Sequence, residues 1–108
     1  MTSDLPLEEK LRLTADLARH HPQNSFTQVD LWAKEWNPLV HPEHSFELLS
    51  AISEYGVEIS MGSMGVNISI FSPVAHNDWV ESDDCGQNLR NAIFGAAVVI
   101  AVANQEGG

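Results

Sequence analysis

The chain has 108 residues and carries 15 Asp and Glu residues against 5 Lys and Arg residues, a formal charge of −10. With 44% hydrophobic residues, it is expected to fold as one domain spanning residues 1–108. Its single cysteine, Cys85, excludes an intrachain disulfide and favours a reducing, cytoplasmic compartment. The acidic excess disfavours direct nucleic-acid binding, which clustered Lys and Arg drive.

The chain also lacks the patterns of membrane targeting. Its first residues do not combine a basic segment with an apolar one, as a signal peptide does. The longest apolar stretch, residues 92–103, is shorter than the ~20 residues that cross a bilayer. We therefore expect no membrane span.

The first expected element is an amphipathic helix from Leu5 to His20. Leu7, Leu11 and Ala18 recur at helical spacing, which indicates one buried side. Pro22 follows the pattern and would end the helix.

The next segment, residues 23–37, fits two structures. Val29, Trp32 and Trp36 have helical spacing, whereas residues 25–31 alternate between polar and apolar. A short helix is the favoured interpretation.

A second helix is expected to begin near residues 41–43, where a proline and an acidic residue suit the first turn. Phe46, Leu49 and Ile52 would then point inward. Gly56 is the expected C-terminal stop.

The strongest strand pattern follows this helix. Residues 57–61 and 66–70 each alternate apolar with polar side chains, and the Gly-Ser-Met-Gly segment at 62–65 predicts a turn. Together they predict a β-hairpin with one apolar face. Its polar face is expected to be either solvated or part of a contact surface.

Residues 74–84 are expected to form a polar loop that contains His76 and Trp79. The last helix would begin at Asp83 or Asp84, where a carboxylate can accept backbone N–H groups. Residues 92–103 are apolar on all sides, which predicts a buried helix. Residues 104–108 are expected to fray.

These elements predict an α+β fold, in which a small antiparallel hairpin or sheet packs with about three helices, including a buried C-terminal helix. The order of Trp36-Asn37-Pro38-Leu39, a helix, a strand pair and Leu89-Arg90-Asn91-Ala92-Ile93 resembles the small phage proteins of the phage ABA sandwich type. The resemblance covers about residues 36–101 and departs at Asn91, where that pattern has a second basic residue. It implies an α+β fold and a phage or prophage origin, with no catalytic residues to carry over.

Two groups of residues are candidates for chemistry. His41 and His44 have the spacing of two metal ligands on one helical face, but no third ligand is evident, so surface or capping roles are expected. The acidic run with His76 lacks the spacing of a calcium loop and the separated environments of catalytic carboxylates. We expect no catalytic residue, no metal and no cofactor.

The distribution of charge is the strongest functional pattern. No Lys or Arg lies between Lys34 and Arg90. That interval holds nine Asp and Glu residues: Glu35, Glu43, Glu47, Glu54, Glu58, Asp78, Glu81, Asp83 and Asp84. A negative face of this kind attracts a basic partner, although it also serves solubility alone.

We therefore expect a non-enzymatic, phage-encoded accessory protein in the cytoplasm of a bacterial host. It would bind the basic surface of a host protein, such as a defence protein of the CRISPR type, and inhibit it by mimicking nucleic acid. The expected binding residues are Glu54, Glu58, Asp78, Trp79, Glu81, Asp83 and Asp84. Trp79 would be a partly exposed anchor or, in the alternative, would close the edge of the core.

Other functions stay open at this point. One is an oligomeric protein that binds or sequesters a small ligand such as a nucleotide, with Lys34, Arg90 and helix N-termini as donors. Another is a structural or assembly protein. Homo-oligomerisation is compatible with each of them.

Overall fold

The computed structural model describes residues 5–19, 35–62, 64–71, 75–81 and 84–107. In chain order its elements are α1 (Leu7–Arg19), α3 (Pro42–Ile52), the 3₁₀ turn η2 (Ser53–Tyr55), β1 (Val57–Gly62), β2 (Gly65–Ile70), β3 (His76–Val80) and α4 (Cys85–Gly107). The predicted α+β class is confirmed. The predicted short helix at 23–37 falls largely outside the described residues.

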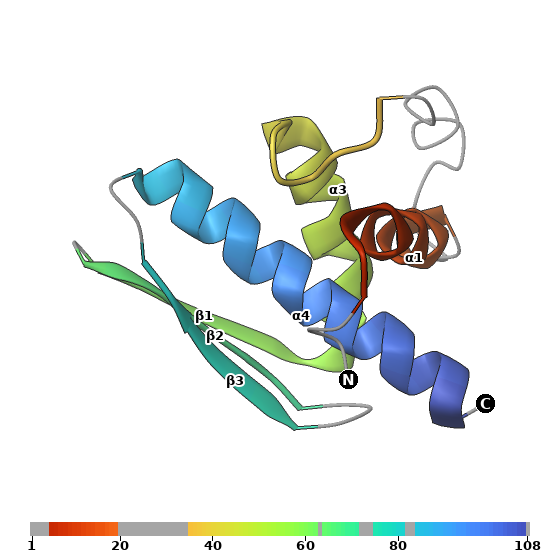
Figure 1. Cartoon of the computed structure of the whole chain (residues 1–108). Coiled ribbons are helices and arrows are strands. Elements are labelled where there is room, and N and C mark those ends of the chain that lie inside the picture. The colour runs from red at the N-terminus through yellow and green to blue at the C-terminus, as the bar shows by residue number, and fades with distance from the viewer. Residues whose placement is uncertain (1–4, 20–34, 63, 72–74, 82–83, 108) are drawn as a thin grey trace.

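Three layers make up the fold (Figure 1). α4 lies in the middle, with β2 and β3 packed on one side and α1 and α3 on the other. Its apolar segment supplies much of the core, as expected of a buried C-terminal helix. The buried members of that segment are Ala92, Ile93, Phe94, Ala96, Ala97, Val98, Ile100 and Ala101.

Both ends of α4 are fixed by side chains. At its start the Asp84 carboxylate accepts the backbone N–H of Gln87 at 3.0 Å, which confirms Asp84 as the residue before the helix. Asp83 lies outside the described residues. Residues 104–107, which were expected to fray, belong to the helix, which continues to Gly107, and Asn104 donates a hydrogen bond to the Tyr55 hydroxyl at 3.2 Å. Gly108 lies outside the described residues.

α3 begins at Pro42 as expected, and after η2 the chain turns at Gly56, whose φ is +79°. The expected inward position of Phe46 is wrong, since 68% of this side chain is exposed. The buried face instead repeats at His44, Leu48 and Ile52, one helical turn apart. Phe46 falls on the opposite side.

The sheet is antiparallel, in the order β1-β2-β3. The predicted hairpin is confirmed, with Val57 opposite Ile70 and Gly62 opposite Gly65. Its central strand buries Val66, Ile68 and Ile70 on the side that faces α4.

The expected loop at 74–84 is wrong over His76–Val80, which forms the third strand and pairs with β2 from Val66↔Val80 to Ile70↔His76. His76, Asp78 and Val80 pair with the residues of β2 that face α4, and only Val80 of these three is apolar. The sequence of this strand therefore lacks a clear alternation of apolar and polar residues. Backbone pairing to β2 stabilises this strand where side-chain burial contributes little.

Candidate functional site

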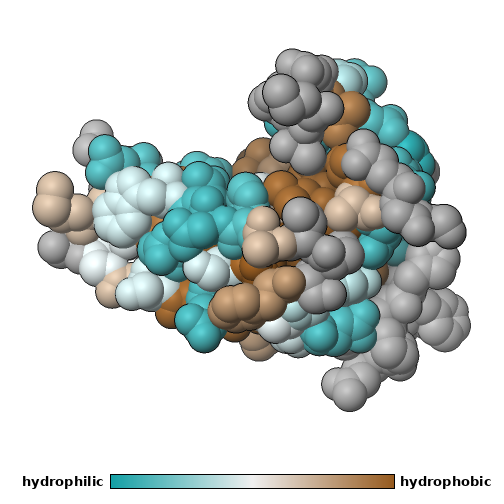
Figure 2. All heavy atoms as spheres, turned by 90° about the horizontal axis from the view of Figure 1, so that it is seen from below, coloured by the Kyte–Doolittle hydropathy of each residue, from teal (hydrophilic) through white to brown (hydrophobic). Residues whose placement is uncertain are grey.

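The side of the sheet that points away from α4 is left uncovered by the other described elements (Figure 1). Antiparallel partners share a face, so Ser60, Asn67 and Trp79 form one row across it. Glu58, Ser69 and Asn77 form the next row. We call these six residues together with Glu81 the outer face. Figure 2 shows this side of the molecule, where teal and white side chains gather in the left half of the view and brown side chains lie next to them.

Trp79 is the large aromatic residue of the outer face. Its side chain is 52% exposed, which confirms the expectation of partial exposure. The indole Nε1–H donates to the Glu81 Oε2 atom at 3.3 Å, and the ring lies beside Gly65 of the neighbouring strand. An exposed aromatic ring held on two sides is suited to anchor an interface.

The charged members of the outer face are both acidic. Glu58 is exposed on β1, and Glu81 is exposed just beyond β3. In the same row as Glu58, the Asn77 amide donates to the Ser69 hydroxyl at 2.6 Å and links β3 to β2. The face therefore combines two carboxylates, neutral polar groups and one indole.

Of the predicted binding residues, Glu58, Trp79 and Glu81 lie together on the outer face. The other described ones lie elsewhere. Asp78 points to the opposite side of β3, across from Ile68. Its carboxylate lies at the sheet edge, where it accepts the Trp79 backbone N–H at 3.0 Å.

Two more predicted residues lie away from the outer face. Glu54 belongs to η2, on the helical side of the fold, and Asp84 caps α4. Asp83 lies outside the described residues. The predicted single acidic patch is therefore divided among several parts of the molecule.

The nearest basic residue in the chain after the sheet, Arg90, is directed elsewhere. Its Nε donates to the Leu39 carbonyl oxygen at 3.2 Å, and its Nη2 donates to Gln87 Oε1 at 3.0 Å. These bonds tie α4 to the segment before α3. The guanidinium thus has a structural role between the helices, and the strands themselves contain no Lys or Arg.

The two histidines at metal-ligand spacing have a different role. His44 is buried, its Nδ1 accepts the Asn37 backbone N–H at 3.0 Å, and its ring stacks on Trp36 at 5.2 Å. The expectation that it is a surface or capping residue is therefore wrong. Burial, with the nearby His41 ring, lowers the pKa of His44. In the part of the chain that the structure describes, no three potential ligands gather around a metal position.

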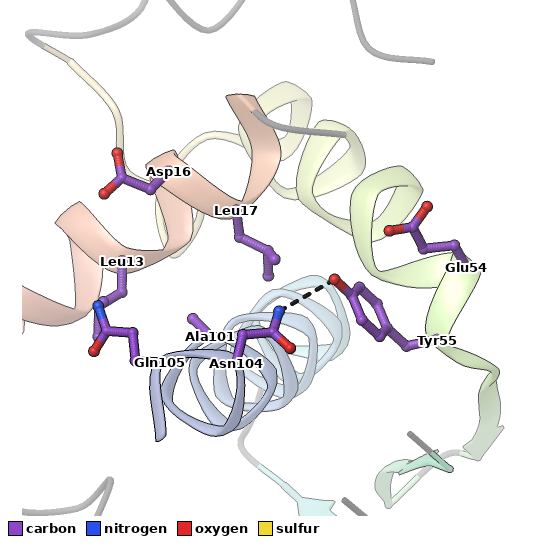
Figure 3. Close-up of a pocket in the computed structure, with 8 residues that line it drawn as sticks. All are labelled: Leu13, Asp16, Leu17, Glu54, Tyr55, Ala101, Asn104 and Gln105. Atoms are coloured by element: carbon purple, nitrogen blue, oxygen red, sulfur yellow. Dashed lines mark hydrogen bonds between the residues drawn. The ribbon is translucent and has the colours of Figure 1, made fainter. Parts of the chain in front are cut away.

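A cavity that the sequence did not predict lies between α1, η2 and α4 (Figure 3). Its volume is about 220 Å³. It is lined by Leu13, Asp16, Leu17, Glu54, Tyr55, Ala101, Asn104 and Gln105. These residues come from three distant segments with no shared spacing, so no local pattern in the sequence marks them as a group.

The fold is α+β, and one face of its sheet is left open by the other described elements and carries two carboxylates, those of Glu58 and Glu81. No family model, no curated protein sequence and no solved structure matches this chain. Among the described helices, none has the length and apolar character needed to cross a membrane.

Proposed function

We propose that this protein is a non-enzymatic binding protein whose outer face docks on a basic surface of another protein. The observation that supports this function is Trp79, a half-exposed indole held between Gly65 and Glu81 on a face whose charged residues are acidic. Indole rings are frequent anchors of interfaces, and a ring already held in place loses little freedom on binding. Carboxylates beside it would pair with Lys and Arg of the partner.

The chemistry of the surface indicates the class of partner. Proteins that bind nucleic acid present clustered Lys and Arg to the phosphates. Glu58 and Glu81 would take the place of phosphate groups on such a surface, and the net charge of −10 would accelerate the encounter. In its concrete form, the proposal is a phage-encoded inhibitor of a nucleic-acid-binding host protein, such as a bacterial defence complex of the CRISPR type.

The experiment uses the purified protein on beads and the heparin-binding fraction of a bacterial lysate, which is enriched in proteins with basic surfaces. Each retained protein is then purified and titrated against the wild type. We expect binding that weakens steeply with added salt and that double-stranded DNA displaces. Retention of no protein at low salt, or binding that is insensitive to salt, would count against the proposal.

Variants localise the interaction. Trp79→Ala and Glu58→Lys should each weaken binding, whereas Glu8→Lys makes the same charge change on α1, across α4 from the sheet. Circular dichroism and thermal unfolding verify that each variant is folded. Equal losses for Glu58→Lys and Glu8→Lys would show that net charge, and not the outer face, determines the affinity.

A further inference from the structure

We propose that β1 pairs with β1 of a second copy of this chain, in antiparallel orientation, and joins the two sheets into one continuous sheet. β1 is an outer strand in the order β1-β2-β3, so one side of its backbone faces away from the sheet. Paired strands share their faces, so the outer faces of both copies would lie on the same side of the joined sheet and stay exposed. The inference goes beyond the function proposed above and does not depend on it.

The hydrogen bonds of the hairpin determine which backbone groups of β1 reach its free edge. The Phe71 N–H donates to the Gly56 carbonyl oxygen at 3.1 Å, and bonded pairs alternate along an antiparallel ladder. Every second residue of β1 therefore bonds to β2, and the residues between direct their N–H and C=O groups to the free edge. These edge residues are Val57, Ile59 and Met61. At the free edge, no other described residue forms a hydrogen bond with their backbone groups.

The opposite edge of the sheet is blocked. On β3 the same alternation directs the backbone groups of Asn77 and Trp79 away from β2. The Asp78 carboxylate accepts the Trp79 N–H at 3.0 Å, so an added strand would have to displace this bond beside a negative charge. Charged side chains, prolines and bulges commonly protect edge strands in this way. β1 has no proline and no bulge, and its one charged residue, Glu58, belongs to the outer face.

The apolar side of β1 is covered only in part. α4 packs on β2 and β3, where Ile68 is completely buried. On β1, Val57 and Ile59 are half-buried and Met61 is 58% exposed. The apolar side chains of a second β1 would lie next to these residues and remove part of their surface from water.

One register makes β1 complementary to itself. When Ile59 lies opposite Ile59 of the second copy, Val57 lies opposite Met61, and each such pair exchanges both of its N–H···O bonds. On the outer face the same register sets Glu58 opposite Ser60. A shift of the strands by two residues in one direction sets the two Glu58 carboxylates opposite each other, which destabilises a strand pair. The same shift in the other direction moves Val57 past the end of the second strand.

The dimer is expected to be weak. A single pair of short strands buries less than the about 1,200–2,000 Å² of a stable interface, and the formal charge of −10 on each copy adds repulsion. We expect a dissociation constant on the order of 100 µM. Two-fold pairing occupies the free edge of both copies, and β3 blocks the other edges, so association should stop at the dimer.

Sedimentation equilibrium of the full chain, from about 10 µM to about 1 mM, tests the association. The mass should rise from that of a monomer toward that of a dimer and no further. Added salt should strengthen the dimer, because it screens the repulsion between two negative copies. The same salt should weaken binding of the outer face to a basic partner, so the two proposals can fail separately. A monomer at every concentration, or growth beyond the dimer, would overturn the proposal.

Hydrogen exchange locates the interface without any substitution. Between about 10 µM and about 1 mM, the amides of Val57, Ile59 and Met61 should exchange about threefold to fivefold more slowly, as the expected dissociation constant implies. The amides of Asn77 and Trp79, at the other edge, should not change. Slower exchange at β3, or at neither edge, would refute the assignment to β1.

Met61→Lys places a charge on the apolar side of the edge at an exposed position, and should weaken the dimer at least about fivefold. Phe46→Lys makes the corresponding change on α3, where 68% of the side chain is exposed, and should leave the dimer intact. Circular dichroism and thermal unfolding verify that both variants are folded. Equal losses would show that the strand edge is not the interface.

Ser60→Lys tests the register by a gain of affinity. It places an ammonium group opposite Glu58 of the second copy, and symmetry repeats this pair. The dimer should become about twofold to tenfold tighter than in Asn67→Lys, which makes the same charge change in the same row of the outer face but on β2. Equal affinities of the two variants would show that only net charge matters and would contradict the register.

Discussion

The indole of Trp79 lies so close to Gly65 that a methyl group on this glycine would stand 2.8 Å from the Cζ2 atom of the ring. The same methyl group would lie 2.5 Å from the Val80 carbonyl oxygen, which belongs to the backbone. The missing side chain at Gly65 therefore allows the anchor of the outer face to take its position.

Gly65→Ala should lower the free energy of unfolding by about 1–3 kcal/mol, because backbone and ring must both shift to admit the methyl group. Urea denaturation followed by circular dichroism measures this change. The turn offers its own control at Gly62, opposite Gly65, where an added methyl group would meet no heavy atom of the described residues within 4 Å. Gly62→Ala should therefore change stability by less than about 0.5 kcal/mol. Similar effects of the two substitutions would contradict the close packing.

Thr14 connects α1 to Trp36. Its hydroxyl accepts the Trp36 Nε1–H at 3.1 Å and donates to the Leu11 carbonyl oxygen at 3.0 Å. Thr14→Val keeps the shape but leaves the buried indole N–H without its acceptor, so the free energy of unfolding should fall by about 1–3 kcal/mol. Thr14→Ser retains the hydroxyl and should lose less. A valine variant as stable as the wild type would show that the bond contributes nothing.

His44 should make stability depend on pH. Burial, followed by the nearby His41, lowers its pKa below the ordinary value of 6.5, against the opposing effects of Glu43 and Glu35. The unfolded chain therefore takes up a proton near pH 6.5 while the folded chain does not. The stabilising contribution is fully present above that pH and decreases as the pH falls toward the lowered pKa.

Urea denaturation at about pH 7.5 and about pH 5.5 measures this loss of stability. In His44→Asn the side-chain oxygen can accept the Asn37 N–H in place of Nδ1, and the difference between the two pH values should become smaller. An unchanged difference would assign the pH dependence to other groups.

Asp84 should contribute to stability through its hydrogen bond at the start of α4. Asp84→Ala removes the acceptor of the Gln87 N–H and should cost about 0.5–2 kcal/mol. Asp84→Asn keeps an oxygen at this position and should retain most of the stability. If asparagine is as destabilising as alanine, the negative charge, and not the capping bond, is what the helix requires. Thermal unfolding of the three proteins distinguishes these cases.

The hairpin and α4 could be predicted because periodic burial produces their sequence patterns. Val66, Ile68 and Ile70 alternate with polar residues since one side of β2 faces α4. The apolar run at 92–103 reflects a helix with layers on two sides. Where a segment is buried on a regular set of positions, its pattern indicates both the element and the buried face.

Other features depend on contacts between distant segments. His76–Val80 is mostly polar because it lies at the edge of the sheet, and its pairing with β2 leaves no mark on its own composition. The helical spacing of α3 is compatible with a buried face that includes Phe46 or with one that includes His44. The structure buries His44, whose ring stacks on Trp36. In the candidate site, the partial exposure of Trp79 could be predicted from the sequence. Its position in one row with Ser60 and Asn67 could not, because that depends on the register of the strands.

The central position of α4 has a consequence for biosynthesis. A ribosome delivers α1, α3 and the three strands before residues 85–107, yet both outer layers bury their apolar sides against that helix. Until it emerges, the nascent chain exposes Ile52, Ile68 and Ile70, which the finished fold buries almost completely. Chaperones that recognise exposed apolar segments can therefore bind the chain during this interval. The chain can fold in a single cooperative step only after α4 has left the exit tunnel.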